Sequence, residues 1–305
     1  MEIKFALALC FCSVIFFGQK IKVLDAETQK PIPYAKLILK EKAYYRNTEE
    51  NGEAMLENSE EISEIQSFGF ENLSIEKYQN VYLLKPVYTD INSVEISKPK
   101  FQYTLKTGEI IDENSSFGGF AATWTVANYF PFEEKFRKTR FIKSVHFAYD
   151  LKKKKKAKIK LVFYRSEYGK PSDKIWKSYI VECSSKKNIA EFELENPVPF
   201  PEEGVFVGFE WINSKENTIK QKFYYSKSEP GLSDIRDFFS LSIESHKTNH
   251  PEIWVLGKIV WQNEESKRKM SGKYHQEGWL KYEDFVEKPH TNIDLNRRLS
   301  IQLEL

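Results

Sequence analysis

Short runs in which apolar and polar side chains alternate make up most of the chain from Ile21 onward. In residues 190–195 the alternation directs one alanine, one phenylalanine and one leucine toward a core and three glutamates toward water. Residues 158–164 repeat the pattern, whereas residues 204–212 are apolar on both faces, as in the central strand of a sandwich. No helical period extends beyond about ten residues. The pattern predicts an all-β protein.

The length of the chain and one proline predict how it divides into domains. A chain of 305 residues is about twice the common domain size. Strand-like sequence at 93–96 is followed by Pro99, which interrupts ladder pairing and suits a linker. We expect a first domain at 20–97, a linker at 98–106 and a larger, jelly-roll-like β-sandwich at 107–305. The strands of the larger domain are expected near residues 141–150, 157–165, 177–184, 189–195, 204–212, 221–226, 253–262 and 298–304.

The first domain carries turn and strand residues at distinctive spacings. They are Val23, Asp25, Thr28, Pro31, Ile32, Pro33, Tyr34, Ala35, Thr48, Glu50, Asn51, Gly52, Ser67, Phe68, Gly69, Phe70, Leu83, Leu84, Lys85, Pro86 and Val94. With these residues the segment resembles the carboxypeptidase regulatory-like domain, a transthyretin-like β-sandwich of exported bacterial proteins. It departs from that family at Lys20, where the family often has glycine, and it lacks the usual glycine before Thr48.

The resemblance implies a module and no activity. The zinc-binding histidine and glutamate pattern of the metallocarboxypeptidases is not found in the sequence, so carboxypeptidase activity is not supported. The larger domain, through residues 205–211, loosely resembles the sandwich attached to such modules in other exported proteins, and this assigns no biochemical function.

The beginning of the chain predicts export. Lys4 precedes an apolar run at residues 5–18, which has the layout of a secretory signal. The run is shorter than the roughly 20 residues needed to span a bilayer, which disfavours a permanent anchor. We expect a signal peptide at 1–19, removed near Gly18 or Gln19. A lipid anchor on Cys10 is an alternative, although Leu9 is too large beside an acceptor cysteine.

Cysteine content and charge limit which disulfides and which partners are expected. Cleavage would remove Cys10 and Cys12 and leave Cys183, so no disulfide within the mature chain is expected. Cys183 lies in an apolar run and is expected to be a small buried hydrophobe. The 46 basic and 44 acidic residues are interspersed, which argues against nucleic acid or an anionic membrane as a partner.

Four residues of the larger domain are candidates for ligand binding. Glu210 lies between Phe209 and Trp211 in the most apolar strand, where an unpaired charge is costly. It therefore lies on an open or concave face, or it pairs with a buried lysine or arginine. Trp254 and Trp261 are seven positions apart, so a regular strand places them on opposite faces unless Gly257 hosts a bulge. The candidates are Glu210, Trp211, Trp254 and Trp261.

His246 and His250 are weak metal candidates. They are four positions apart, as in zinc-binding helices, but position 247 is a lysine and Pro251 follows. A loop site that adds Glu252 or His275 is the alternative. The sequence has no Gly-x-Ser-x-Gly elbow and no phosphate-binding glycine loop, and we expect no cofactor.

These features predict a noncatalytic, exported binding or adhesion protein, with a glycan as the expected ligand. The alternative is a structural or assembly component of the cell envelope that docks protein. A third hypothesis is a hydrolase whose site is built from loops around Glu210 and the late histidines. Glycan binding requires exposed aromatic rings, protein docking an apolar patch, and hydrolysis two acids or a metal cluster in one cleft.

Overall fold

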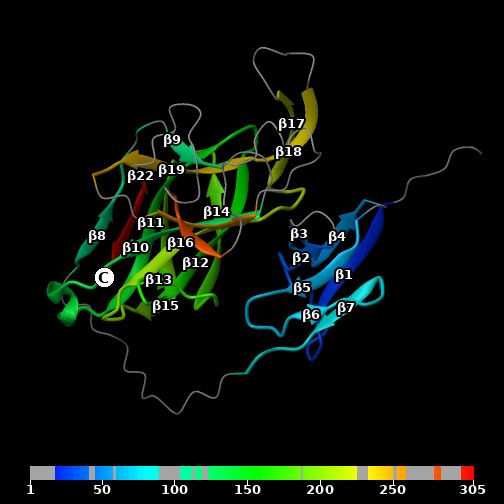
Figure 1. The fold of residues 1–305 in the computed structure, drawn as a ribbon, viewed down its shortest axis with the longest axis horizontal. Coiled ribbons are helices and arrows are strands. Elements are labelled where there is room, and N and C mark those ends of the chain that lie inside the picture. The colour runs from blue at the N-terminus through cyan, green and yellow to red at the C-terminus, as the bar shows by residue number, and fades with distance from the viewer. Residues whose placement is uncertain are drawn as a thin grey trace, which may run out of the picture. The chain divides into compact units, whose positions relative to one another are not determined.

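The computed structural model describes most of the chain as two compact units built from β-strands, which confirms the all-β prediction. The first unit comprises residues 1–41 and 47–87, and the second comprises 42–46 and 88–305. The described residues are 18–40, 45–57, 60–88, 104–111, 113, 115–118, 123–186, 188–224, 233–249, 253–258, 278–282 and 297–305 (Figure 1). Nearly all of the expected signal peptide, the expected boundary at Ser97 and most of the expected linker lie outside them, so these limits stay predictions.

Two sheets contain the strands of the first unit, which includes only Asn47 of β3 (Figure 1). The first sheet has the strand order β4-β1-β7 and the second has the order β3-β2-β5-β6. The strands are β1 (Gln19–Asp25), β2 (Lys36–Leu39), β3 (Tyr45–Asn47), β4 (Glu53–Leu56), β5 (Ile62–Gln66), β6 (Leu73–Ser74) and β7 (Val81–Leu84). Ala35, Leu37 and Leu39 are buried together, as their alternation predicts.

Two turns of the first unit contain a glycine with positive φ. Gly52, in the turn between β3 and β4, has a φ of +74°, and a Cβ there would lie 2.8 Å from the Val23 carbonyl oxygen. Gly69, just after β5, has a φ of +85° with open space around it. Gly69 is therefore required for its backbone conformation and not for a close approach.

Two seven-stranded sheets make up most of the second unit. One has the order β13-β12-β16-β10-β20-β21, with β14 beside β12. Its strands are β10 (Thr123–Phe130), β12 (Lys156–Glu167), β13 (Lys170–Pro171), β14 (Lys177–Ser184), β16 (Val205–Trp211), β20 (Ile253–Lys258) and β21 (Trp279–Lys281). The other has the order β22-β19-β11-β23-β8, with β15 beside β11 and β9 beside β19. Its strands are β8 (Lys106–Glu109), β9 (Ser115–Phe117), β11 (Phe141–Leu151), β15 (Ile189–Pro199), β19 (Leu241–Lys247), β22 (Arg297–Leu299) and β23 (Ile301–Glu304). A hairpin of β17 (Thr218–Tyr224) and β18 (Ser233–Phe239) and a 3-10 helix at Glu134–Lys138 complete the described elements.

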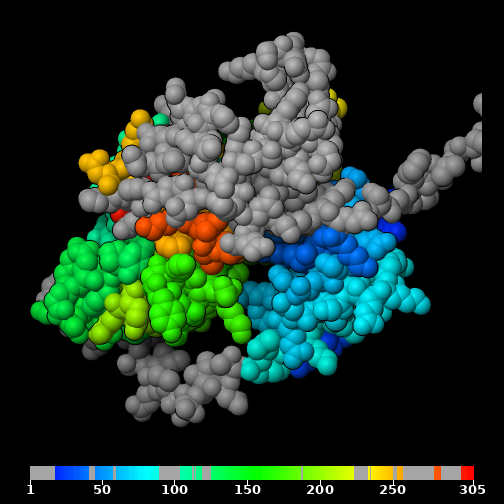
Figure 2. All heavy atoms as spheres, in the orientation of Figure 1, coloured from blue at the N-terminus to red at the C-terminus, as the bar shows by residue number. Residues whose placement is uncertain are grey.

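One apolar core joins the facing sides of the two seven-stranded sheets. All seven residues of β16 are buried between β10 and β12, which confirms the predicted central strand at 204–212. In β15, Ala190 and Leu194 are buried, Phe192 is half-buried against the core, and Glu191, Glu193 and Glu195 are exposed, as the alternation predicts. The space-filling view shows one face of the molecule, with the described residues of the first unit in blue to cyan (Figure 2).

The lysine-rich segment 152–156 connects β11 to β12, which lie in different seven-stranded sheets, so these two strands do not form a hairpin. Lys154 in this segment is half-buried. Its Nζ donates hydrogen bonds to the backbone carbonyls of Lys215, at 2.9 Å, and of Glu216. Within the described residues, no helix has the length and apolar composition needed to cross a membrane.

Candidate functional site

Glu210 is paired with a buried lysine. Strand β16 places it directly opposite Lys160 of β12, and Lys160 Nζ lies 3.2 Å from Glu210 Oε1. The Lys160 side chain is 13% exposed and the Glu210 side chain is 3% exposed. The sequence allowed either an open or concave face around Glu210 or a pair with a buried lysine or arginine, and the structure has the buried pair. Burial, followed by the charge of Glu210, raises the pKa of neighbouring Tyr164 well above its usual value, so that hydroxyl stays protonated.

Trp211 is a core anchor. Its side chain is fully buried, and Nε1 donates a hydrogen bond to the Leu241 carbonyl at 2.9 Å. The ring packs against Phe239 with a centroid separation of 6.0 Å. Both faces of the indole are therefore enclosed by protein, and no face is free to stack on a ligand.

Trp254 lies on the face of its sheet that is turned away from the sandwich core. It clusters there with Ala127, Val162, Tyr164, Phe206 and Trp279, and 7% of its surface is exposed. The Phe206 ring meets it edge-on at 5.9 Å between centroids. Trp261 lies outside the described residues, so the predicted placement of the two rings on opposite faces stays a prediction.

His246 is a buried polar residue of β19. Its Nδ1 lies 3.2 Å from the Ser300 hydroxyl, which donates to the Ile111 carbonyl at 2.7 Å. Burial lowers the pKa of His246 and favours the neutral imidazole. His250 lies outside the described residues. The described part of the chain contains no group of three or more potential metal ligands.

A set of three polar residues on β11 and β23 was not found by sequence reasoning. Ser144 Oγ lies 3.0 Å from His146 Nε2, and Glu304 Oε2 lies 3.7 Å from the same nitrogen. A nucleophile triad needs the serine and the acid on different ring nitrogens, so this arrangement does not form one. The Ser-x-His spacing on a strand indicates a shared face, but only the fold brings Glu304 beside it.

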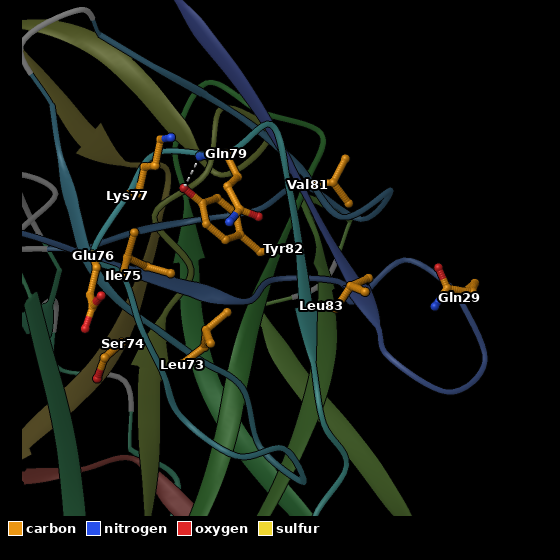
Figure 3. Close-up of a pocket in the computed structure, with 10 residues that line it drawn as sticks. All are labelled: Gln29, Leu73, Ser74, Ile75, Glu76, Lys77, Gln79, Val81, Tyr82 and Leu83. Atoms are coloured by element: carbon orange, nitrogen blue, oxygen red, sulfur yellow. Dashed lines mark hydrogen bonds between the residues drawn. The ribbon is translucent and has the colours of Figure 1, made fainter.

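The described residues of the first unit form a groove of about 650 Å³ between the edge strands of its two sheets, β6 and β7 (Figure 3). Tyr82 is buried at its side, and its hydroxyl accepts a hydrogen bond from the Gln79 backbone N–H at 2.9 Å. The lining residues are Gln29, Leu73, Ser74, Ile75, Glu76, Lys77, Gln79, Val81, Tyr82 and Leu83.

The edge of β7 beside this groove is open over a short stretch. The parallel pairing with β1 uses Asn80 and Leu84, because their carbonyls accept hydrogen bonds from Lys22 and Ala26, both at 2.8 Å. By the alternation of a parallel ladder, the backbone groups of Val81 and Leu83 point away from β1. Beyond Leu84 the edge is occupied again, because Glu71 donates to the Lys85 carbonyl at 2.8 Å.

Apolar side chains lie exposed on the outer face of the same sheet. Val81 and Leu83 are 45% and 46% exposed, and Met55 on β4 is 58% exposed. In register, Lys22 lies between Glu53 and Val81. Lys20 and Lys22 both pair with Glu53, at 2.9 and 3.6 Å, so this carboxylate offsets one of the two lysine charges on the face. We call Val81 and Leu83, which are adjacent on this face of β7, the apolar strip; Met55 lies across β1 from them, beyond Lys20 and Lys22.

Comparison of the chain with protein-family models, with curated proteins and with solved structures gives no match. Any functional assignment therefore rests on the residues themselves.

Proposed function

We propose that the protein is a noncatalytic, exported binding protein that docks another protein through its first unit. The observation that carries this proposal is the apolar strip. Exposed aliphatic side chains at neighbouring positions of one sheet are a surface that a monomeric domain usually avoids unless it binds something. The adjoining groove gives the same surface a concave border.

Protein docking has better support than glycan binding. Stacking on a sugar needs an aromatic ring with a free face, but Trp211 and Trp254 are both buried. Glu210 is held by Lys160 and is equally enclosed. Among the candidate residues that the structure describes, none offers a surface for a sugar.

Export belongs to the proposal and rests on Lys4 and the apolar run at 5–18. The resemblance of the first unit to the carboxypeptidase regulatory-like domain fits the same compartment. Fractionation of cells and sequencing of the mature N-terminus test this part. We expect a chain that begins near Gln19 outside the cytoplasm, and a cytoplasmic chain that retains Met1 would contradict it.

Docking is tested with two matched double variants of the full-length protein. Val81→Ser with Leu83→Ser removes two exposed aliphatic side chains from the apolar strip. Ile180→Ser with Ile189→Ser removes two aliphatic side chains of similar exposure from the second unit. Photo-crosslinking from position 83 in the producing cell, followed by mass spectrometry, identifies the partner to be purified.

We expect the purified partner to bind the first double variant at least about tenfold more weakly, because two apolar contacts of about 1 kcal/mol are lost. Binding to the second double variant should be unchanged. The proposal fails if position 83 gives no adduct, or if the two variants weaken binding equally.

A further inference from the structure

We propose that the groove between β6 and β7 binds an extended strand of the partner protein, which adds to the open edge of β7. This inference rests on the proposed function and specifies how the partner is recognised. The evidence is the backbone geometry of Val81 and Leu83, the nature of the groove walls and the charges at the groove ends.

The backbone of β7 specifies an extended ligand. Val81 and Leu83 each present one N–H and one carbonyl away from β1, two residues apart along the edge. This spacing matches the donors and acceptors of another strand, and a helix has no free backbone groups to meet them. The free stretch ends where residues 69–71 rejoin the edge at Lys85, so it accommodates a short strand.

The composition of β7 separates it from a protected edge in the same chain. Strand β15 is an edge of its sheet and carries exposed Glu191, Glu193 and Glu195, together with Pro197. Charges and proline on an edge strand discourage pairing with another chain. Between Val81 and Leu84, β7 has neither. The edge of β7 thus lacks the usual barrier to strand addition.

The walls and ends of the groove define the chemistry of the ligand. Leu73 and Ile75 are half-buried on the β6 side, facing the β7 side across the groove (Figure 3). A strand between these walls contacts apolar side chains, so it should carry apolar residues at alternate positions. Lys77 points toward Gln79 at one end of the groove, whereas the Glu76 carboxylate points away from Val81 and Leu83 (Figure 3). Lys77 has no ion pair with any described residue, and it favours a carboxylate at that end of the ligand.

The test is a selection of random peptides of about nine residues against the full-length protein. We expect the selected peptides to share alternating apolar residues and an acidic residue near one end. Leu83→Pro removes one edge N–H without touching a bond to β1, and Met55→Pro makes the same change at the β4 edge as a matched control. Each best peptide is also synthesised with alternate backbone amides N-methylated, which keeps its side chains and removes its donors.

We expect N-methylation and Leu83→Pro each to weaken peptide binding by about tenfold, since hydrogen bonds across the edge are lost, while Met55→Pro has no effect. If Leu83→Pro does not fold, the N-methylated peptide decides alone. Undiminished binding of that peptide overturns strand addition and leaves docking on the apolar strip intact. A selection that yields no binder overturns strand addition as well. Peptides insensitive both to N-methylation and to Val81→Ser with Leu83→Ser contradict the inference and the proposed docking surface together.

Discussion

Buried ionisable side chains of the second unit are accommodated in two ways. Glu210 is matched by the Lys160 ammonium directly across the strand pair. Cys183 is buried instead in its neutral form, because desolvation raises the pKa of its thiol to about 12. The first arrangement needs a partner and the second needs none, which makes the two residues respond differently to substitution.

Glu210→Gln should destabilise the second unit by about 3 kcal/mol, because it leaves the Lys160 charge buried without its counterion. The exposed pair of Lys156 and Glu182, on β12 and β14 and 3.2 Å apart, is the matched control. Glu182→Gln should cost less than about 1 kcal/mol. Urea unfolding of both variants measures the difference. Similar losses for the two would mean that Glu210 is not buried with its partner in solution.

His246 should make stability fall as the solution becomes acidic. Burial lowers its pKa below the usual value of 6.5 in the folded chain, although Glu109 and Glu113 oppose the shift. Below about pH 6.5 the unfolded chain therefore binds a proton that the folded chain does not, and folding loses up to about 1.4 kcal/mol per pH unit from this residue. Above pH 6.5 the contribution is constant.

The check is the free energy of unfolding at pH 7.5 and pH 5.5 for the wild-type chain and for His246→Gln. Glutamine keeps a polar group toward Ser300 and cannot titrate. We expect a smaller loss of stability on acidification in the variant. Parallel losses in both proteins would show that His246 does not carry the effect.

At the scale of the strand, the sequence predicts elements whose two faces differ. Strands β11, β12, β14, β15 and β16 lie close to the predicted ranges, because their apolar residues recur with period two or fill both faces. Strand β10 was missed, although it pairs with both β16 and β20. Its apolar run is interrupted by Thr125 and Asn128, which are buried.

Asn128 is buried because of a contact that no local pattern reveals. Its side-chain amide donates to the Leu299 carbonyl at 2.9 Å and accepts from the Leu299 N–H at 3.1 Å. Prediction of the candidate site from the sequence is limited in the same way. Sequence reasoning recognised the cost of burying Glu210 but could not identify Lys160, and in the all-apolar β7 it could not tell which side chains face water. The burial of Asn128, the pairing of Glu210 and the exposure of the β7 side chains all depend on contacts with residues far away in the sequence.

Gly208 should be the least replaceable residue of β16. A Cβ there would lie against the Val126 carbonyl oxygen and 2.5 Å from Ala127 Cα, both in neighbouring β10. Because these are backbone atoms of a paired strand, Gly208→Ala should cost about 3 kcal/mol by forcing the two strands apart. Gly169→Asn is the control, since Gly169 has a φ of +77°, which asparagine tolerates, and open space around it. Thermal melts that rank the two variants in the opposite order would contradict this packing.

At the scale of the whole molecule, each compact unit has its own buried residues. Ile21, Val23, Leu37, Ile65 and Leu84 are buried in the first unit. The described part of the large core comes from residues 117–305, all within the second unit. A unit with its own core can unfold as a cooperative system of its own. The smaller unit should do so with the smaller enthalpy, because unfolding enthalpy scales with residue number.

Calorimetry of the full-length protein should therefore resolve two transitions that respond to different substitutions. Leu37→Ala opens a cavity in the first unit and should cost about 2–5 kcal/mol, while Phe209→Ala does the same in the second unit at about 3–5 kcal/mol. A given loss of free energy lowers the melting temperature of a small unit roughly twice as much as that of a large one. We thus expect Leu37→Ala to shift only the low-enthalpy transition, and by more degrees than Phe209→Ala shifts the high-enthalpy one. A single transition that both substitutions lower would mean that the units unfold together, and the first unit would then not act as an independent docking module.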